Sequence, residues 1–372
     1  MSTVFVYHLN QLKREAHMKG FGIIEPLKRV GWVEKEMPIA GPFEAVLEPV
    51  ALIPCTSDVD TAAENPNIPV GRILGHEGVG RIVSVGSEVK DFKPGDIVAV
   101  PAVTPNWHDL NVQDNLHQHA GGYLGGRYLS SKWDGMFAEY FKVPDVDLNV
   151  AKIPEGVSLE AAALVGDMVT TGFHGVELAD VKFGDEVVVI GIGPVGLMSV
   201  VGCTLRGASH IYCVGHRPIT RQRAMEFGAT ATVDYQEGPI VDQIMALTGG
   251  KQIDKVIIAG GEPTVFNDAL ALIKYNGVVA NLAGHGRTRL ELPIYTTESG
   301  FGFCAHKTVT GGLCPGGRRR IERLMAMVQA GRFEPEKLLT HKFYGFDAIE
   351  DAFNLMAGRP QDIIKPIIYM EK

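Results

Sequence analysis

The side chains best suited to chemistry are a cysteine, a histidine and carboxylates that are spread over the first half of the chain. Cys55 precedes Ser57, His76 precedes Glu77, and Asp167 follows much later. A thiolate, an imidazole and carboxylates suit zinc, and three protein ligands leave a fourth position open for a substrate oxygen. A buried cysteine and a core histidine would account for the same residues without a metal. The residues alone therefore leave both interpretations open.

A glycine motif in the second half of the chain predicts dinucleotide binding. A strand-like run over residues 186–190 leads into the motif, and a helical run follows. The motif contains Gly191, Gly193, Pro194, Val195 and Gly196. The glycines would permit a tight turn, a close approach of the backbone to a pyrophosphate, and helix–strand packing. The pyrophosphate would bind the free N–H groups at the start of the helix. A tight turn without a ligand is the alternative.

The residues after the next strand indicate which dinucleotide is preferred. An NAD enzyme carries an acid there to bind the ribose 2′-hydroxyl. This chain instead has Gly215, His216 and Arg217 after the strand 211–214. A glycine makes room, and an arginine supplies a charged fork for a 2′-phosphate. We therefore expect NADP(H).

Two kinds of pattern must position these residues. From residue 18 to about 150, short β segments alternate with Gly and Pro, which is typical of a barrel-like β domain. From about 171 to 311, strands alternate with helices, which predicts a parallel sheet covered on both faces. The segment 312–372 is too short for a domain of its own, so we expect it to rejoin the first one. Residues 1–17 read as an N-terminal extension without a secretory signal.

Composition limits the class of protein. The chain has 372 residues, 45% hydrophobic and 21% charged, which is enough for two globular domains. The formal net charge of −8 argues against nucleic acid or an anionic membrane as partner. Five cysteines without paired spacing fit a reducing compartment, so we expect a cytoplasmic protein.

Several longer stretches resemble the zinc-dependent medium-chain alcohol dehydrogenases. They are most similar to the branch of NADP-dependent secondary alcohol dehydrogenases of anaerobic microbes. The resemblance runs from Met18 to the end, through the stretches 54–58, 75–80, 89–96, 167–175, 188–196, 305–308 and 311–317. It implies an α/β fold with a GroES-like β-barrel catalytic domain and a Rossmann doubly wound parallel-sheet cofactor domain. The domains would be a catalytic zinc domain over 18–170, an NADP-binding domain over 171–311, and the C-terminal part of the catalytic domain over 312–372.

The resemblance also implies roles for individual residues. Cys55, His76 and Asp167 would be the ligands of one catalytic zinc per subunit, and Glu77 would be an exchangeable fourth ligand or lie just behind the ligands. Gly215, Arg217 and Tyr235 would bind the 2′-phosphate end of the cofactor. The activity would be hydride transfer between NADP(H) and small secondary alcohols or ketones, such as isopropanol and acetone, in a homotetramer.

If these residues bind a catalytic zinc, Ser57 can take part in proton transfer. A hydroxyl two residues after a ligand can reach the substrate oxygen and pass its proton toward solvent. A serine that caps a turn is the alternative. The family usually has a histidine five residues after the zinc cysteine as the outer member of this relay, and this chain has Asp60 there. An aspartate could still relay a proton through water.

Other departures from the family pattern affect substrate and metal. Arg127 stands where the branch has a tryptophan that lines the substrate pocket, and His216 replaces a serine in the 2′-phosphate motif. Many relatives bind a structural zinc through four cysteines near 100–130, but no cysteine lies between Cys55 and Cys203, so we expect no structural zinc. Histidines in that lobe are His108, His117 and His119.

Alternative functions remain open at this point. Arg127 could favour polar substrates, which makes an NADP-dependent polyol dehydrogenase of the sorbitol or threonine type the nearest alternative. A zinc-free quinone or enoyl reductase of the same superfamily would lack Cys55, His76 and Asp167. A cofactor-binding protein without catalysis is supported only by Asp60 and Arg127.

Overall fold

The computed structural model describes residues 17–120, 133–285 and 306–371. Its contacts divide the chain into two compact units. One unit ends at Asp167 and resumes at Pro315, and the other is Met168–Cys314. These divisions lie within a few residues of the expected boundaries at 170/171 and 311/312. Among the described residues, no helix is both long and apolar enough to cross a membrane.

The first unit is built around a mostly antiparallel seven-stranded sheet, in the order β14-β15-β3-β4-β5-β7 with β6 beside β3. Its strands are β3 (Ala45–Leu52), β4 (Gly78–Val85), β5 (Ile97–Val100), β6 (Phe141–Val143), β7 (Ala151–Lys152), β14 (Leu339–Tyr344) and β15 (Lys365–Tyr369). A separate antiparallel hairpin joins β1 (His17–Glu25) to β2 (Arg29–Glu36). The helices of this unit are α2 (Thr56–Glu64), α3 (Val146–Asn149), α4 (Leu159–Leu164), α10 (Arg318–Gln329) and α11 (Ile349–Gly358).

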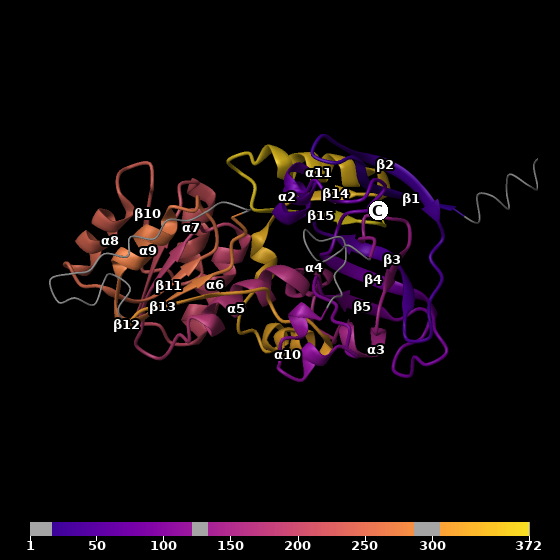
Figure 1. Ribbon diagram of the computed structural model, residues 1–372, viewed down its shortest axis with the longest axis horizontal. Helices are drawn as coiled ribbons and strands as arrows, with labels where there is room; N and C mark the ends of the chain where they lie inside the picture. The colour runs from indigo at the N-terminus through magenta and orange to yellow at the C-terminus, as the bar shows by residue number, and fades with distance from the viewer. Residues whose placement is uncertain (1–16, 121–132, 286–305, 372) are drawn as a thin grey trace, which may run out of the picture. The chain divides into compact units, whose positions relative to one another are not determined.

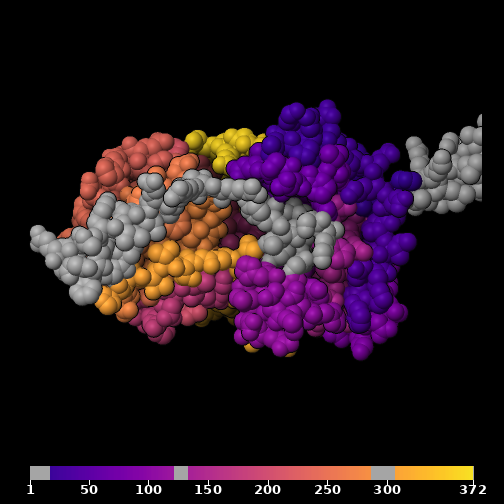
Figure 2. Space-filling model, in the orientation of Figure 1, coloured from indigo at the N-terminus to yellow at the C-terminus, as the bar shows by residue number. Residues whose placement is uncertain are grey.

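The end of the chain belongs to this first unit. Strand β15 pairs antiparallel with β3, and α11 contacts α2. Figure 2 shows the last residues, in yellow, directly beside the indigo N-terminal part of the chain. Helix α11 places Phe353 against Phe21 of β1, with ring centroids 5.3 Å apart, in one buried cluster. Burial of such aromatic pairs is a strong apolar contribution, so the C-terminal segment completes this core.

The second unit contains a six-stranded parallel sheet in the order β10-β9-β8-β11-β12-β13. The strands are β8 (Glu186–Ile190), β9 (His210–Val214), β10 (Ala231–Val233), β11 (Ile253–Ile258), β12 (Ile273–Asn281) and β13 (Thr308–Gly311). In chain order this is the 3-2-1-4-5-6 arrangement of dinucleotide-binding folds. Its switch point lies between β8 and β11, where the order reverses and a cofactor is expected.

Helices cover both faces of this sheet (Figure 1). They are α5 (Thr170–Leu178), α6 (Pro194–Leu205), α7 (Pro218–Glu226), α8 (Ile240–Thr248) and α9 (Val265–Leu272). On β11, Val256 and Ile258 join the core shared with α8 and α9, while Ile257 lies near Gly175 of α5 on the opposite face. Because side chains alternate along a strand, the continuous apolar run 256–258 is buried on both faces of the sheet. The predicted fold class, a GroES-like barrel domain plus a doubly wound Rossmann domain, is confirmed.

Candidate metal centre and cofactor edge

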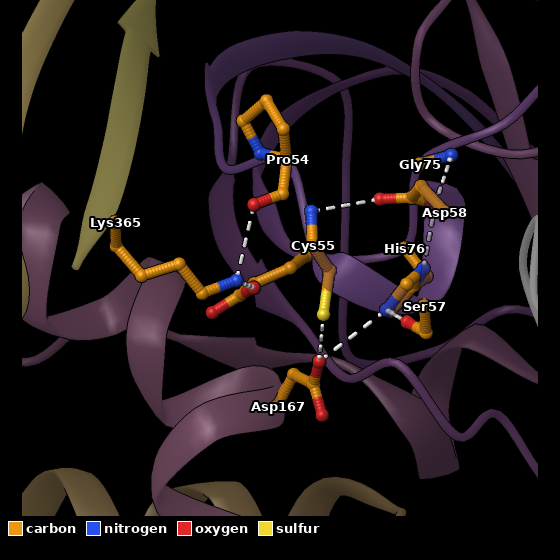
Figure 3. Close-up of polar contacts among 9 residues, drawn as sticks. Pro54, Cys55, Ser57, Asp58, Gly75, His76, Asp167 and Lys365 are labelled. Atoms are coloured by element: carbon orange, nitrogen blue, oxygen red, sulfur yellow. Dashed lines mark hydrogen bonds and ion pairs between the residues drawn. The ribbon is translucent and has the colours of Figure 1, made fainter. Parts of the chain in front are cut away.

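Cys55, His76 and Asp167 converge in the first unit. All three side chains are buried, and one ligand atom of each lies within 4.8 Å of the others. Sγ of Cys55 is 3.6 Å from Oδ2 of Asp167, and Nε2 of His76 is 3.3 Å from the same oxygen. Figure 3 shows the three side chains pointing toward one another. Within the part of the chain that the structure describes, this is the single group of three or more such residues close enough to hold a metal ion.

Helix α2 fixes the cysteine. Cys55 is the N-cap of α2, and its backbone N–H donates to Oδ2 of Asp58, 2.9 Å away. Asp58 is the third residue of the helix, a position from which an acidic side chain commonly bonds back to the N-cap N–H. This local contact sets the direction in which the Cys55 side chain leaves the chain.

The same carboxylate orients the histidine. Oδ1 of Asp58 lies 3.1 Å from Nδ1 of His76 and accepts the backbone N–H of Gly75 at 3.0 Å. Gly75 has φ +92°, and a Cβ there would lie 2.3 Å from the ring of Phe137. A glycine is therefore required immediately before His76, both for backbone conformation and for space.

A π-helix presents the aspartate. Val165–Val169 forms this short π-helix after α4, and Asp167 lies at its centre. A Cβ on Gly166 would come within 2.5 Å of the Val100 carbonyl oxygen, and Ala102 N–H donates to the Gly166 carbonyl at 3.0 Å. The close approach anchors the wide turn to the end of β5. Such π segments occur frequently at functional sites.

The charges around His76 favour a cation at this point. Burial by itself lowers the pKa of His76, but Asp58, Asp167 and Cys55 outweigh it and raise the pKa well above its ordinary value. A site that stabilises a proton in this way also suits a metal ion, which displaces that proton when it binds. The donor set of thiol, imidazole and carboxylate fits zinc.

Glu77 and Lys365 form a buried ion pair behind the cluster. Both are fully buried, and Nζ of Lys365 donates to Oε2 of Glu77 at 2.5 Å and to the Pro54 carbonyl at 3.1 Å. Burial raises the pKa of Glu77 to about 8, against the lowering effect of the Lys365 charge. Oε1 of Glu77 accepts no hydrogen bond from the described residues.

Ser57 and Asp60 lie on α2 at different distances from the cluster. Oγ of Ser57 is 3.0 Å from Nε2 of His76, so the hydroxyl borders the ligand atom of the histidine. Asp60 instead accepts a hydrogen bond from Arg359 at 3.3 Å. Its place in a proton relay stays a prediction. Arg127 lies outside the described residues.

The glycine motif occupies the switch point of the second unit. Gly191 follows β8 with φ +87°, and a Cβ there would lie 2.7 Å from the backbone nitrogen of Gly260. A Cβ on Gly196 would lie 2.0 Å from the Gly191 carbonyl oxygen, so only glycine fits there. A Cβ on Gly193, by contrast, would meet nothing within 4 Å. Gly193 is thus the open position, at the N-cap of α6, with Pro194 and Val195 in the first turn. The N–H groups of that turn lack partners within the helix.

The residues expected to bind the 2′-phosphate follow two neighbouring strands. Gly215, His216 and Arg217 follow β9, and Tyr235 follows β10, which pairs with β9. The rings of His216 and Tyr235 lie 5.8 Å apart, edge to face. A Cβ on Gly215 would come within 2.3 Å of Ile192, so packing also requires this glycine, beyond the room for phosphate inferred from the sequence.

Two residues that shape the metal cluster escaped the sequence reasoning. Asp58 was visible as an acid in the first turn of a helix, a signal that could have identified it. Lys365 lies in an apolar strand and meets Glu77 across 288 positions of sequence, so no local pattern marks it.

Comparisons with known proteins agree with this architecture. The alcohol dehydrogenase GroES-like domain matches residues 41–155, and the zinc-binding dehydrogenase domain matches 194–330. An NADP-dependent isopropanol dehydrogenase of Thermoanaerobacter brockii is 51% identical over 95% of this chain and 100% of its own length. One of Clostridium beijerinckii is 49% identical over 95% and 100%. The zinc-dependent alcohol dehydrogenase 2 of Streptococcus pneumonia, 29% identical, superposes with a TM-score of 0.83 over 95% of this chain and 98% of that one.

The resemblance drawn from the sequence motifs is therefore confirmed. Relatives this similar match the chain over their full lengths, and two family domains match it in succession, over 41–155 and 194–330. The chain belongs to the zinc-dependent medium-chain alcohol dehydrogenase family.

Proposed function

We propose that this protein transfers a hydride between NADP(H) and small secondary alcohols or ketones, of the isopropanol/acetone and 2-butanol/2-butanone type. The observation that carries the proposal is the buried group of Cys55, His76 and Asp167. The 51% identity with an NADP-dependent isopropanol dehydrogenase supports the choice of cofactor and substrate class. The first unit is then the catalytic domain and the second the cofactor domain.

Zinc held by Cys55, His76 and Asp167 would polarise the substrate oxygen, and the nicotinamide would accept or return the hydride. Asp58 orients His76, so that Nε2 would be the ligand atom. Ser57 lies beside that atom and would hold the proton that leaves the alcohol. Asp60 would be its outer acceptor, in contact with Arg359 at the surface. Glu77, with one oxygen unpartnered among the described residues, is the candidate exchangeable ligand.

The cofactor would lie along the carboxyl edge of the parallel sheet. Gly191, Gly193 and Gly196 would admit the pyrophosphate at the start of α6. Gly215, His216, Arg217 and Tyr235 would surround the 2′-phosphate. No acid follows β9 at the position where an NAD enzyme holds its ribose, which supports NADP(H).

Metal content, assembly and location complete the proposal. It includes one catalytic zinc per subunit, no structural zinc, a homotetramer and a cytoplasmic setting, with no nucleic-acid or membrane partner. The net charge of −8 and the unpaired cysteine spacing support the setting. Family resemblance supports the tetramer, which sedimentation would test.

The first experiment is a steady-state assay of ketone reduction. NADPH consumption is followed with acetone and 2-butanone, before and after removal of zinc by a chelator, with NADH in a parallel series. We expect rapid reduction that prefers NADPH and is lost with the metal. Turnover of a polyol with NADP⁺ in place of ketone reduction would instead favour the sorbitol-type alternative. Activity that is unaffected in Cys55→Ser would contradict the metal site.

A further inference from the structure

A buried carboxylate lies next to the proposed 2′-phosphate contacts. Asp234 directly follows β10, precedes Tyr235, and is only 8% exposed. Its Oδ1 accepts the backbone N–H of Gln236 at 2.9 Å, and its backbone carbonyl accepts from the side chain of Gln243 at 2.7 Å. These contacts hold the carboxylate at the carboxyl edge of the sheet, where the cofactor is expected.

Such a carboxylate opposes the binding of NADP(H). A phosphate monoester carries a charge of about −1.5 to −2 at neutral pH. A nearby carboxylate repels it, and burial limits the screening of that repulsion by salt. A site that prefers NADP(H) therefore requires a positive charge that compensates Asp234.

Arg221 is placed to provide this charge. It lies in the first turns of α7, the helix whose N-cap is Arg217. Nη1 of Arg221 is 3.5 Å from Oδ2 of Asp234, and Nε donates to Oγ1 of Thr232 on β10 at 3.1 Å. The Arg221 side chain is 31% exposed, so the guanidinium is partly desolvated and held from two sides.

We propose that Arg221 is a specificity-determining positioning residue that neutralises Asp234 and thereby allows the 2′-phosphate to bind beside Tyr235. The inference rests on the proposed NADP(H) dependence and deepens it. Arg217 supplies charge to the phosphate itself, whereas Arg221 acts through Asp234. Cofactor preference in this chain then depends on the balance of three charges, those of Arg217, Arg221 and Asp234.

The test measures the contribution of the 2′-phosphate to binding separately from that of the rest of the cofactor. Binding of 2′,5′-ADP and of 5′-AMP is measured by calorimetry for the full-length protein, because these ligands differ only in that phosphate. Arg221→Gln removes the charge, and Arg221→Lys retains it. Arg223→Gln is the matched control on the same helix, because Arg223 pairs with Glu226 at 2.5 Å and not with Asp234. Asp234→Asn is combined with Arg221→Gln to test rescue.

We expect Arg221→Gln to weaken 2′,5′-ADP binding about tenfold, equivalent to one charge-assisted contact, and to leave 5′-AMP binding unchanged. Arg221→Lys and Arg223→Gln should keep the preference, and Asp234→Asn should restore most of the affinity lost in Arg221→Gln. An equal loss for both ligands would identify a purely structural role and overturn the proposal. Absence of rescue by Asp234→Asn would overturn it as well.

These outcomes are separate from failure of the proposed function. If the unmodified protein binds 2′,5′-ADP no better than 5′-AMP, the NADP(H) preference itself is wrong, whatever the variants do. If the unmodified protein prefers 2′,5′-ADP and Arg221→Gln retains that preference, only the role of Arg221 is refuted.

Discussion

Nδ1 of His76 lies 3.1 Å from Oδ1 of Asp58, and this contact turns Nε2 of the same ring toward Asp167, 3.3 Å away. Asp58 is fully buried, and it also fixes the backbone of Cys55 and of Gly75. One carboxylate that does not itself belong to the cluster therefore orients two of its three members. Carboxylates that bond to a ligating histidine commonly raise its basicity and fix its tautomer.

Asp58→Asn should weaken zinc binding about 10–100-fold, the usual effect of losing such a partner. The amide can still accept a hydrogen bond, but it no longer supplies the negative charge that faces His76. Competition with a chelator of known affinity measures the change. Glu64→Gln, at the exposed end of the same helix, is the control and should bind zinc normally. Unchanged zinc affinity in Asp58→Asn would show that Asp58 serves only the backbone.

Lys365→Met should lower the free energy of unfolding of the metal-free protein by about 3–5 kcal/mol, because it leaves the buried Glu77 either charged without a partner or protonated well above its ordinary pKa. The loss should be smaller at acid pH, where an unpaired buried carboxyl is protonated and neutral. Denaturant titration measures the effect, and adding Glu77→Gln should recover much of it. Lys182→Met removes an exposed pair with Asp180 and should change nothing measurable. A Lys365→Met protein as stable as the parent would refute the buried-pair argument.

Gly191→Ala should abolish tight NADPH binding, and Gly184→Ala should not. The two glycines have nearly the same backbone conformation, with φ of +87° and +86°. Each alanine therefore costs about 1–2 kcal/mol in backbone strain. Only at Gly191 does the new Cβ also collide with Gly260 at the switch point, because nothing lies within 4 Å at Gly184. Fluorescence titration with NADPH and unfolding of both variants separate the local collision from the common strain. Equal NADPH affinity in the two variants would count against the cofactor site.

Ser57→Ala should reduce kcat about 100-fold or more, with zinc and NADPH still bound, because it removes the hydroxyl beside Nε2 of His76. Stopped-flow measurement of hydride transfer, with zinc content determined in parallel, checks the expectation. Ser84→Ala, on the exposed part of β4, is the matched control. If Ser57→Ala retains full activity, the hydroxyl only contacts His76 and another group moves the proton.

Local sequence was sufficient to predict the strand, glycine turn and helix at the start of the second unit. The run from β8 through Gly191 to α6 is continuous, so its apolar strand, its glycine spacing and its apolar helix all lie within one short stretch. Element ends were less accurate. Helix α6 begins at Pro194, inside the glycine motif itself, because proline is well accommodated in a first helical turn.

The sequence by itself determined the fold class, the parallel sheet with its glycine turn, and a set of candidate donors that fit zinc. It could not determine that Cys55, His76 and Asp167 meet, since their proximity depends on β3, β4 and the π-helix packing into one unit. Nor could it show that Lys365 supports Glu77 or that Arg221 holds Asp234. The periodicity of apolar residues indicates which face of a helix or strand is buried. Contacts between elements that are distant in the sequence form only when those elements pack together in the folded core. Those contacts decide which acids and bases become partners.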